Sequence, residues 1–132
     1  MPLVRISLRE GKTEEYKRAL GDGVHRAMVE AIEAPAQDRF QIITEHPASG
    51  LIYDPTYLGV QRTENIVIVQ ITMSTGRKPP QKRKLFQRMA EILAENPGVR
   101  SEDVFVMMHS LPFDNFSFAD GLTISEAASV TK

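Results

Sequence analysis

The sequence predicts an α+β fold in which two β-α-β units form one four-stranded sheet with two helices on one of its faces. Three observations lead to this expectation. A strand, a helix and a second strand can be traced in each half of the chain, and apolar residues recur at helical spacing between the strands of each half. A helical crossover favours parallel pairing of the strands that it joins, so two such units can pair edge to edge.

The first unit is expected at residues 1–62. Alternating apolar and polar residues at 2–8 indicate a strand. Thr13 is suited to cap a helix that ends near Glu33, and residues 40–44 form a second apolar, β-prone run before a turn-rich stretch. The helix is predicted from apolar positions at helical spacing, which are Tyr16, Leu20, Val24, Ala27, Met28 and Ala31.

The second unit is expected at residues 63–132 and includes a C-terminal tail. Residues 66–73 form the strongest β pattern of the chain, and residues 104–111 form the last full strand. Between them, Pro79 favours a helix start and the Asn-Pro-Gly sequence at 96–98 favours its end. The apolar face of this helix is predicted to consist of Leu85, Phe86, Met89, Ile92 and Leu93.

One face of the predicted sheet lacks a covering layer. In residues 66–73 and 104–111, apolar side chains occur on both faces of the predicted strands, so both faces favour burial. Oligomerisation is the simplest way to cover the second face.

Composition excludes several classes of protein. A chain of 132 residues fits a single domain, and 16 basic against 17 acidic side chains give no sign of a nucleic-acid partner. The absence of cysteine excludes disulfides and thiolate chemistry. No stretch approaches the roughly 20 apolar residues of a membrane span, and the N-terminus lacks an apolar leader. We therefore expect a cytoplasmic protein with no membrane partner.

Six segments spread over nearly the whole chain carry a family resemblance. They read MPLVRISLREGKT, HRAMVEAI, PAQDRFQIITEHPA, LGVQRTENIVIVQIT, QKRKLF and FDNFSFADG. Together they resemble the tautomerase superfamily, and within it malonate semialdehyde decarboxylase and its relatives. The resemblance implies a homotrimer of β-α-β units that acts through an N-terminal proline, without a cofactor, on a small oxo-acid substrate.

Pro2 is the first candidate catalytic residue. Removal of Met1 would expose its secondary amine at the start of a strand. An α-amino group titrates near pH ~8, so apolar burial favours the neutral base and nearby carboxylates favour the cation. The resemblance implies a neutral proline that shuttles a proton in tautomerases, and a charged one that polarises the substrate in the decarboxylase and dehalogenase branches.

The remaining site residues follow from the resemblance. Asp38 matches the aspartate credited with activating water or positioning the substrate, and a loop carboxylate near an amine can act as a general base. Arg77 matches an arginine that grips the substrate carboxylate. The decarboxylase pattern has a second arginine at the place of Thr75, so this chain departs from it there. Phe116, with neighbouring phenylalanines, is expected either to wall an apolar pocket around Pro2 or to seal subunit contacts.

Several alternatives stay open at this point. Overall similarity favours a decarboxylase-like lyase with possible tautomerase or hydratase activity, whereas Thr75 favours a keto-enol tautomerase of the phenylpyruvate type. A non-catalytic trimeric binding or scaffold protein of the same fold is the third reading. The three histidines, His25, His46 and His109, show no metal-ligand spacing, so we predict no metal, and we expect His25 to be a helix-surface residue.

Overall fold

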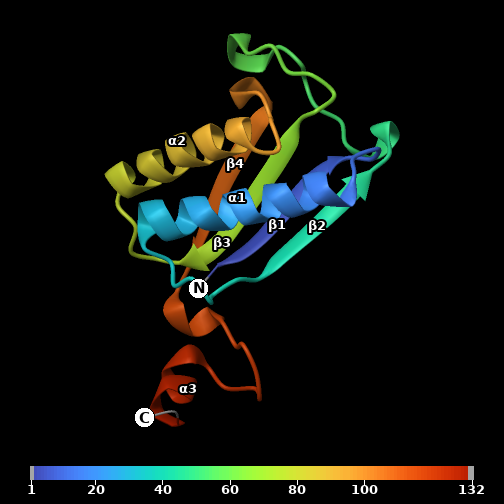
Figure 1. The fold of residues 1–132 in the computed structure, drawn as a ribbon. Helices are drawn as coiled ribbons and strands as arrows, with labels where there is room; N and C mark the ends of the chain where they lie inside the picture. Colours follow the sequence, from blue (N-terminus) through green and yellow to red (C-terminus); the bar gives the residue numbers. More distant parts are fainter. Residues whose placement is uncertain (1, 131–132) are drawn as a thin grey trace.

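The computed structural model describes residues 2–130, and it contains the predicted sheet with both long helices on one face (Figure 1). The strands run in the order β2-β1-β3-β4. β1 pairs parallel with β2 and antiparallel with β3, and β3 pairs parallel with β4. The elements are β1 (Leu3–Arg9), α1 (Glu14–Ile32), β2 (Gln41–His46), β3 (Val67–Ser74), α2 (Pro79–Glu95), β4 (Val104–Leu111) and α3 (Ile124–Val130). The α+β class and the two β-α-β units are therefore confirmed.

The ends of α1 follow the signals in the sequence. The Thr13 hydroxyl accepts a hydrogen bond from the Tyr16 backbone N–H at 3.1 Å, as an N-cap residue does. Glu33 ends the helix in the left-handed conformation, with φ at 56°, and its N–H donates to the Met28 carbonyl. Both predicted boundaries of this helix are confirmed.

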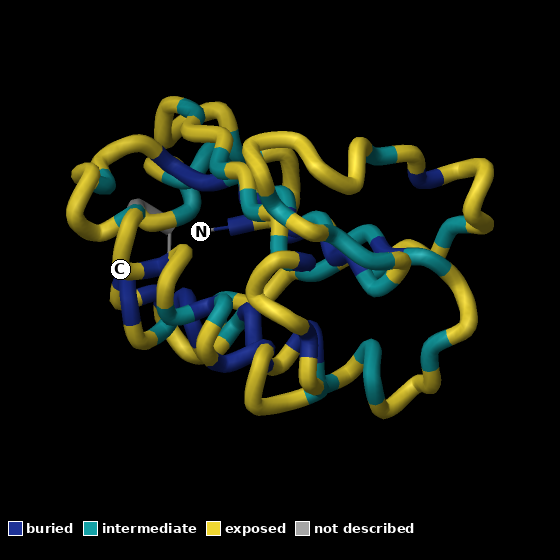
Figure 2. Tube along the Cα trace, turned by 90° about the horizontal axis from the view of Figure 1, so that it is seen from above, coloured by how far each residue is buried: buried dark blue, intermediate teal, exposed yellow. Residues whose placement is uncertain are grey.

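The hydrophobic core lies between the sheet and the two helices. Val4, Ile6 and Leu8 project from β1 toward the helices, and alternate residues of β3 do the same from Val67 onward. Figure 2 shows how buried and exposed stretches alternate along the chain as a result. Phe86 is an exception to the predicted core, because its side chain is 36% exposed. It follows Leu85 by about 100° around the helix, which turns it away from the sheet.

The opposite face of the sheet carries apolar side chains that the described part of the chain leaves uncovered. Arg5 of β1 is paired with Ile42 of β2 and with Gln70 of β3, which in turn is opposite Met107 of β4. Ile42 and Met107 are 40% and 48% exposed. This face therefore has the apolar character that the two-sided strand pattern predicted.

Two irregular segments extend from opposite ends of the sheet (Figure 1). The loop between β2 and β3 projects beyond one end, and the segment after β4 projects beyond the other end, where the N-terminus lies. The second segment contains α3, whereas the sequence predicted only a tail there.

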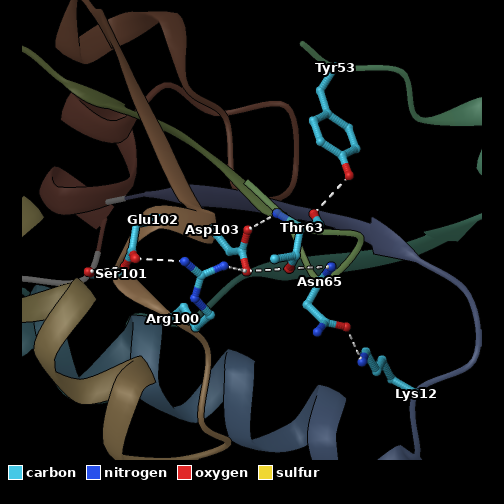
Figure 3. A network of polar contacts seen from close by, with 8 residues as sticks. All are labelled: Lys12, Tyr53, Thr63, Asn65, Arg100, Ser101, Glu102 and Asp103. Carbon is cyan, nitrogen blue, oxygen red and sulfur yellow. Dashed lines mark hydrogen bonds and ion pairs between the residues drawn. The ribbon is translucent and has the colours of Figure 1, made fainter. Parts of the chain in front are cut away.

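A buried carboxylate fastens the β2–β3 loop to the sheet (Figure 3). Asp103 is 1% exposed and accepts hydrogen bonds at 2.6 Å from both the backbone N–H and the hydroxyl of Thr63. The Thr63 carbonyl in turn accepts a hydrogen bond from the Tyr53 hydroxyl at 2.8 Å. Burial raises the pKa of Tyr16, and the nearby charge of Asp103 raises it further.

Candidate active site

Strand register brings the start of the chain to the end of the sheet where several predicted site residues lie. Leu3 is opposite Thr72, so the preceding Pro2 lies beside the last residues of β3. On the other side, the Val4 N–H donates to the Phe40 carbonyl at 3.0 Å, just before β2 begins. The start of β1, the start of β2 and the ends of β3 and β4 therefore share one edge, which lies beside the N-terminus in Figure 1.

Pro2 is buried and lines a cavity of about 230 Å³ at this edge. Its described walls are formed by Pro2, Leu3, Phe40, Phe116, Ser117 and Phe118, none of which carries a charged side chain. Phe116 therefore lies in the same cavity wall as Pro2. A cavity of this size suits a small molecule, since drug-sized ligands occupy about 300–1,000 Å³.

Three aromatic rings give the cavity its apolar character. The Phe40 and Phe118 ring centroids are 5.3 Å apart with planes tilted by 39°, and the Phe116 and Phe118 centroids are 6.4 Å apart. Phe40 and Phe118 remain 48% and 47% exposed, so their faces are open to a ligand. These rings make the cavity wall beside Pro2 apolar.

Asp38 lies at the same edge of the sheet but does not line the cavity. It is partly buried in the loop between α1 and β2, two residues before Phe40. Its backbone N–H donates to the Pro35 carbonyl at 3.0 Å, which closes a turn. The backbone of Asp38 is therefore held in a defined turn close in sequence to Phe40 of the cavity wall.

Thr75 and Arg77 follow β3 at this edge. The Thr75 N–H donates to the Leu111 carbonyl at 3.0 Å, which extends the β3–β4 pairing by one residue, while its side chain is exposed. Arg77 is partly buried, and its guanidinium forms no hydrogen bond or ion pair with the other described residues. Neither residue lines the cavity, so within one chain the structure brings Pro2 and Phe116 together and leaves Asp38, Thr75 and Arg77 around them.

Three cavity residues were not predicted as part of the site, namely Leu3, Phe40 and Ser117. Phe40 was interpreted only as the start of a strand, and Leu3 only as part of the first strand. Their role at the cavity depends on which strand ends meet, and strand pairing across the two units supplies that information.

Models of two tautomerase families match the chain, both described as tautomerase enzymes, one over residues 38–119 and the other over residues 2–61. The chain belongs to the tautomerase family. Probable tautomerase YusQ of Bacillus subtilis (strain 168) is 36% identical over 121 residues, which is 92% of this chain and 95% of the relative. Probable tautomerase YrdN of the same organism is 38% identical over 92% of both chains.

Solved structures place the chain within the same family. FG41 malonate semialdehyde decarboxylase inhibited by 3-bromopropiolate is 37% identical with a TM-score of 0.87, covering 98% of this chain and 95% of that one. A second malonate semialdehyde decarboxylase is 26% identical with a TM-score of 0.89, covering 98% of both chains. The resemblance to the tautomerase superfamily and to this decarboxylase group is thereby confirmed.

Two further findings concern the described residues of this tautomerase family member. Residues 2–130 contain no group of three or more His, Asp and Glu side chains arranged to hold a metal ion. No helix in the same range has both the length and the apolar content needed to cross a membrane.

Proposed function

We propose that this chain is a cofactor-independent enzyme that acts through the N-terminal amine of Pro2 on a small oxo or enol acid that bears a carboxylate. One observation carries the proposal: Pro2 is buried at the start of β1 against an apolar cavity of small-molecule size. The amine becomes available once Met1 has been removed, and Met1 itself lies outside the described residues.

The amine can transfer a proton between oxygen and carbon. In ketonisation of an enol acid, the neutral Pro2 nitrogen takes the proton from the enol oxygen, and the protonated amine then donates a proton to the substrate carbon. The apolar walls keep the two forms of the amine close in energy by destabilising the cation. Asp38 would orient the amine or a water molecule, and Arg77 would bind the substrate carboxylate in a bidentate manner.

The same residues support decarboxylation when the amine is charged. The bond to the carboxylate carbon then breaks, its electron pair moves toward the carbonyl group, carbon dioxide leaves and the resulting enolate carbon takes up a proton. A cationic Pro2 would stabilise the negative charge that develops on the carbonyl oxygen. The 37% identical decarboxylase favours this reaction, whereas the uncharged cavity walls and Thr75 favour the tautomerase reaction.

The test compares both reactions in methionine-free protein, with removal of Met1 verified by mass spectrometry. We expect wild-type protein to ketonise a phenylpyruvate-type enol, to release carbon dioxide from malonate semialdehyde, or to do both. Pro2→Ala should lose at least ~100-fold in the active reaction, in line with typical contributions from general acid–base catalysis. Pro55→Ala, in the distant and exposed loop, serves as the matched control. Turnover of neither substrate would contradict the proposal and would favour a binding or scaffold role.

We further propose that the working enzyme is a homotrimer. The uncovered sheet face carries Phe105 and Met107, which are 47% and 48% exposed and favour burial against other subunits. A fused 4-OT protein that is 28% identical, with a TM-score of 0.73, was solved as an asymmetric trimer. Sedimentation equilibrium should give three times the chain mass of 14.8 kDa, and a monomer mass would contradict this part of the proposal.

A further inference from the structure

We propose that His25 is a positioning residue that holds the Asp38 loop in its working conformation. The inference rests on the proposed function, in which Asp38 takes part in the reaction at Pro2. His25 was expected to be a helix-surface residue, and it lies partly exposed on α1. Its Nε2 lies 2.7 Å from the Ala36 carbonyl oxygen and thereby links α1 to the loop before β2.

Contacts at both ends anchor the loop that contains Ala36. Ala34 is 3% exposed and anchors its beginning in the core, and the Phe40 carbonyl accepts the Val4 N–H at its end. Between these anchors, Pro35, Ala36 and Gln37 are exposed. The side chains of these three residues bury little surface, so the hydrogen bond from His25 to the Ala36 carbonyl contributes to holding this part of the loop.

α1 contacts the loop on both sides of Asp38. His25 binds the carbonyl of Ala36, two residues before Asp38, and Asp22 forms an ion pair at 2.8 Å with Arg39, the residue after it. Asp22 and His25 are three residues apart, so they lie next to each other on one helix face. Both partners of the Asp22–Arg39 pair are substantially exposed, and such pairs contribute little. We therefore assign the positioning role to His25.

The acceptor fixes the direction of the histidine contact. A carbonyl oxygen can only accept, so Nε2 carries the hydrogen and donates it. A glutamine at this position offers an amide donor at a similar distance from the backbone, whereas leucine offers none.

The experiment is a double-mutant cycle on the active reaction, with His25→Leu and Asp38→Asn made separately and together. We expect His25→Leu to lower kcat by roughly tenfold with little change in KM, as expected for a misplaced catalytic group rather than for lost substrate binding. In the Asp38→Asn background the same change should have an effect below about twofold, because His25 acts through Asp38. His25→Gln should restore most of the activity, and Arg26→Leu, an exposed neighbour on α1, is the matched control.

The possible outcomes separate this inference from the proposed function. Additive effects of the two substitutions, or failure of His25→Gln to restore activity, would overturn the positioning role while Pro2 and Asp38 keep theirs. An Asp38→Asn variant with full activity would overturn the role of Asp38 and this inference with it. Loss of activity in Pro2→Ala would still support the proposed role of the Pro2 amine. The inference would also be contradicted if His25→Leu lowered the melting temperature enough to explain its loss of kcat. In that case kcat would fall by the same factor in the Asp38→Asn background.

Discussion

Removal of the Asp103 carboxylate should destabilise the protein more than any other single change to a polar side chain of the β2–β3 loop and its anchor. Asp103→Ala leaves the Thr63 N–H and hydroxyl without their acceptor, both of which now donate at 2.6 Å to a residue that is 1% exposed. Hydrogen bonds to charged groups contribute about 1.5–3 kcal/mol each, and water can reach the partly buried Thr63 in the variant. We therefore expect a loss of about 3 kcal/mol in the free energy of unfolding.

Two further variants divide this loss between the two hydrogen bonds. Thr63→Val removes only the hydroxyl donor and should cost about 1–2 kcal/mol. Asp103→Asn keeps one acceptor oxygen and places an amide donor against the second Thr63 donor, so its cost should fall between those of the other two variants. Glu102→Gln, in which an exposed carboxylate loses its 2.7 Å pair with Arg100, is the control and should change stability by less than about 1 kcal/mol.

Urea unfolding monitored by circular dichroism at one fixed protein concentration measures these differences, since oligomerisation makes apparent stability depend on concentration. The expected loss for Asp103→Ala corresponds to a fall in melting temperature of roughly 10 °C for a chain of this size. A loss below about 1 kcal/mol would show that the buried carboxylate is compensated elsewhere and that the loop is held by other contacts.

Two further predictions concern substrate binding and acid stability. Arg77→Ala should raise KM for a carboxylate substrate by at least about tenfold, while Lys78→Ala should leave it nearly unchanged; steady-state kinetics decides, and equal effects would contradict the role of Arg77. Glu30 accepts hydrogen bonds from Arg88 of α2 and from Arg26, and these lower its pKa below the ordinary 4.5. Its contribution to stability is therefore fully present above its unfolded pKa and is lost as the pH falls through the lower folded pKa. Glu30→Gln should make the free energy of unfolding depend less on pH in the acid range. Urea unfolding at several acid pH values measures this, and the same pH dependence in wild type and variant would contradict the prediction.

Periodicity in the sequence was sufficient to predict the fold. Residues 104–111 were predicted as a strand with the boundaries that β4 has, and Thr13 and the Asn-Pro-Gly stop located the helix ends to within about a residue. These features are local, because each depends on the alternation or capping of neighbouring residues. The α3 helix was missed because it is short and has only a weak apolar pattern.

The site was predicted less completely, and the reason is geometric. Pro2 and Phe116 could be proposed from the family resemblance, and the structure places both on one cavity. Phe40 joins them only because β2 begins beside β1 at the edge where β3 ends, which no local pattern reveals. The contact of His25 with Ala36 likewise depends on how the chain returns to α1 after Glu33. The metal, cofactor and location expectations, and the division at residues 62 and 63, stay predictions.

The antiparallel pairing of β1 with β3 relates the two β-α-β units of the chain as near-equivalent halves. An amino terminus, however, occurs once in a polypeptide. Ile66, which precedes β3 as Pro2 precedes β1, has an ordinary peptide nitrogen, which donates to the Thr63 carbonyl at 3.2 Å. Under the proposed function, each chain therefore offers one reactive nitrogen for two units. The end of the sheet beside Ile66 contains no residue of the proposed site, so we expect new contacts engineered there to leave the proposed reaction unchanged.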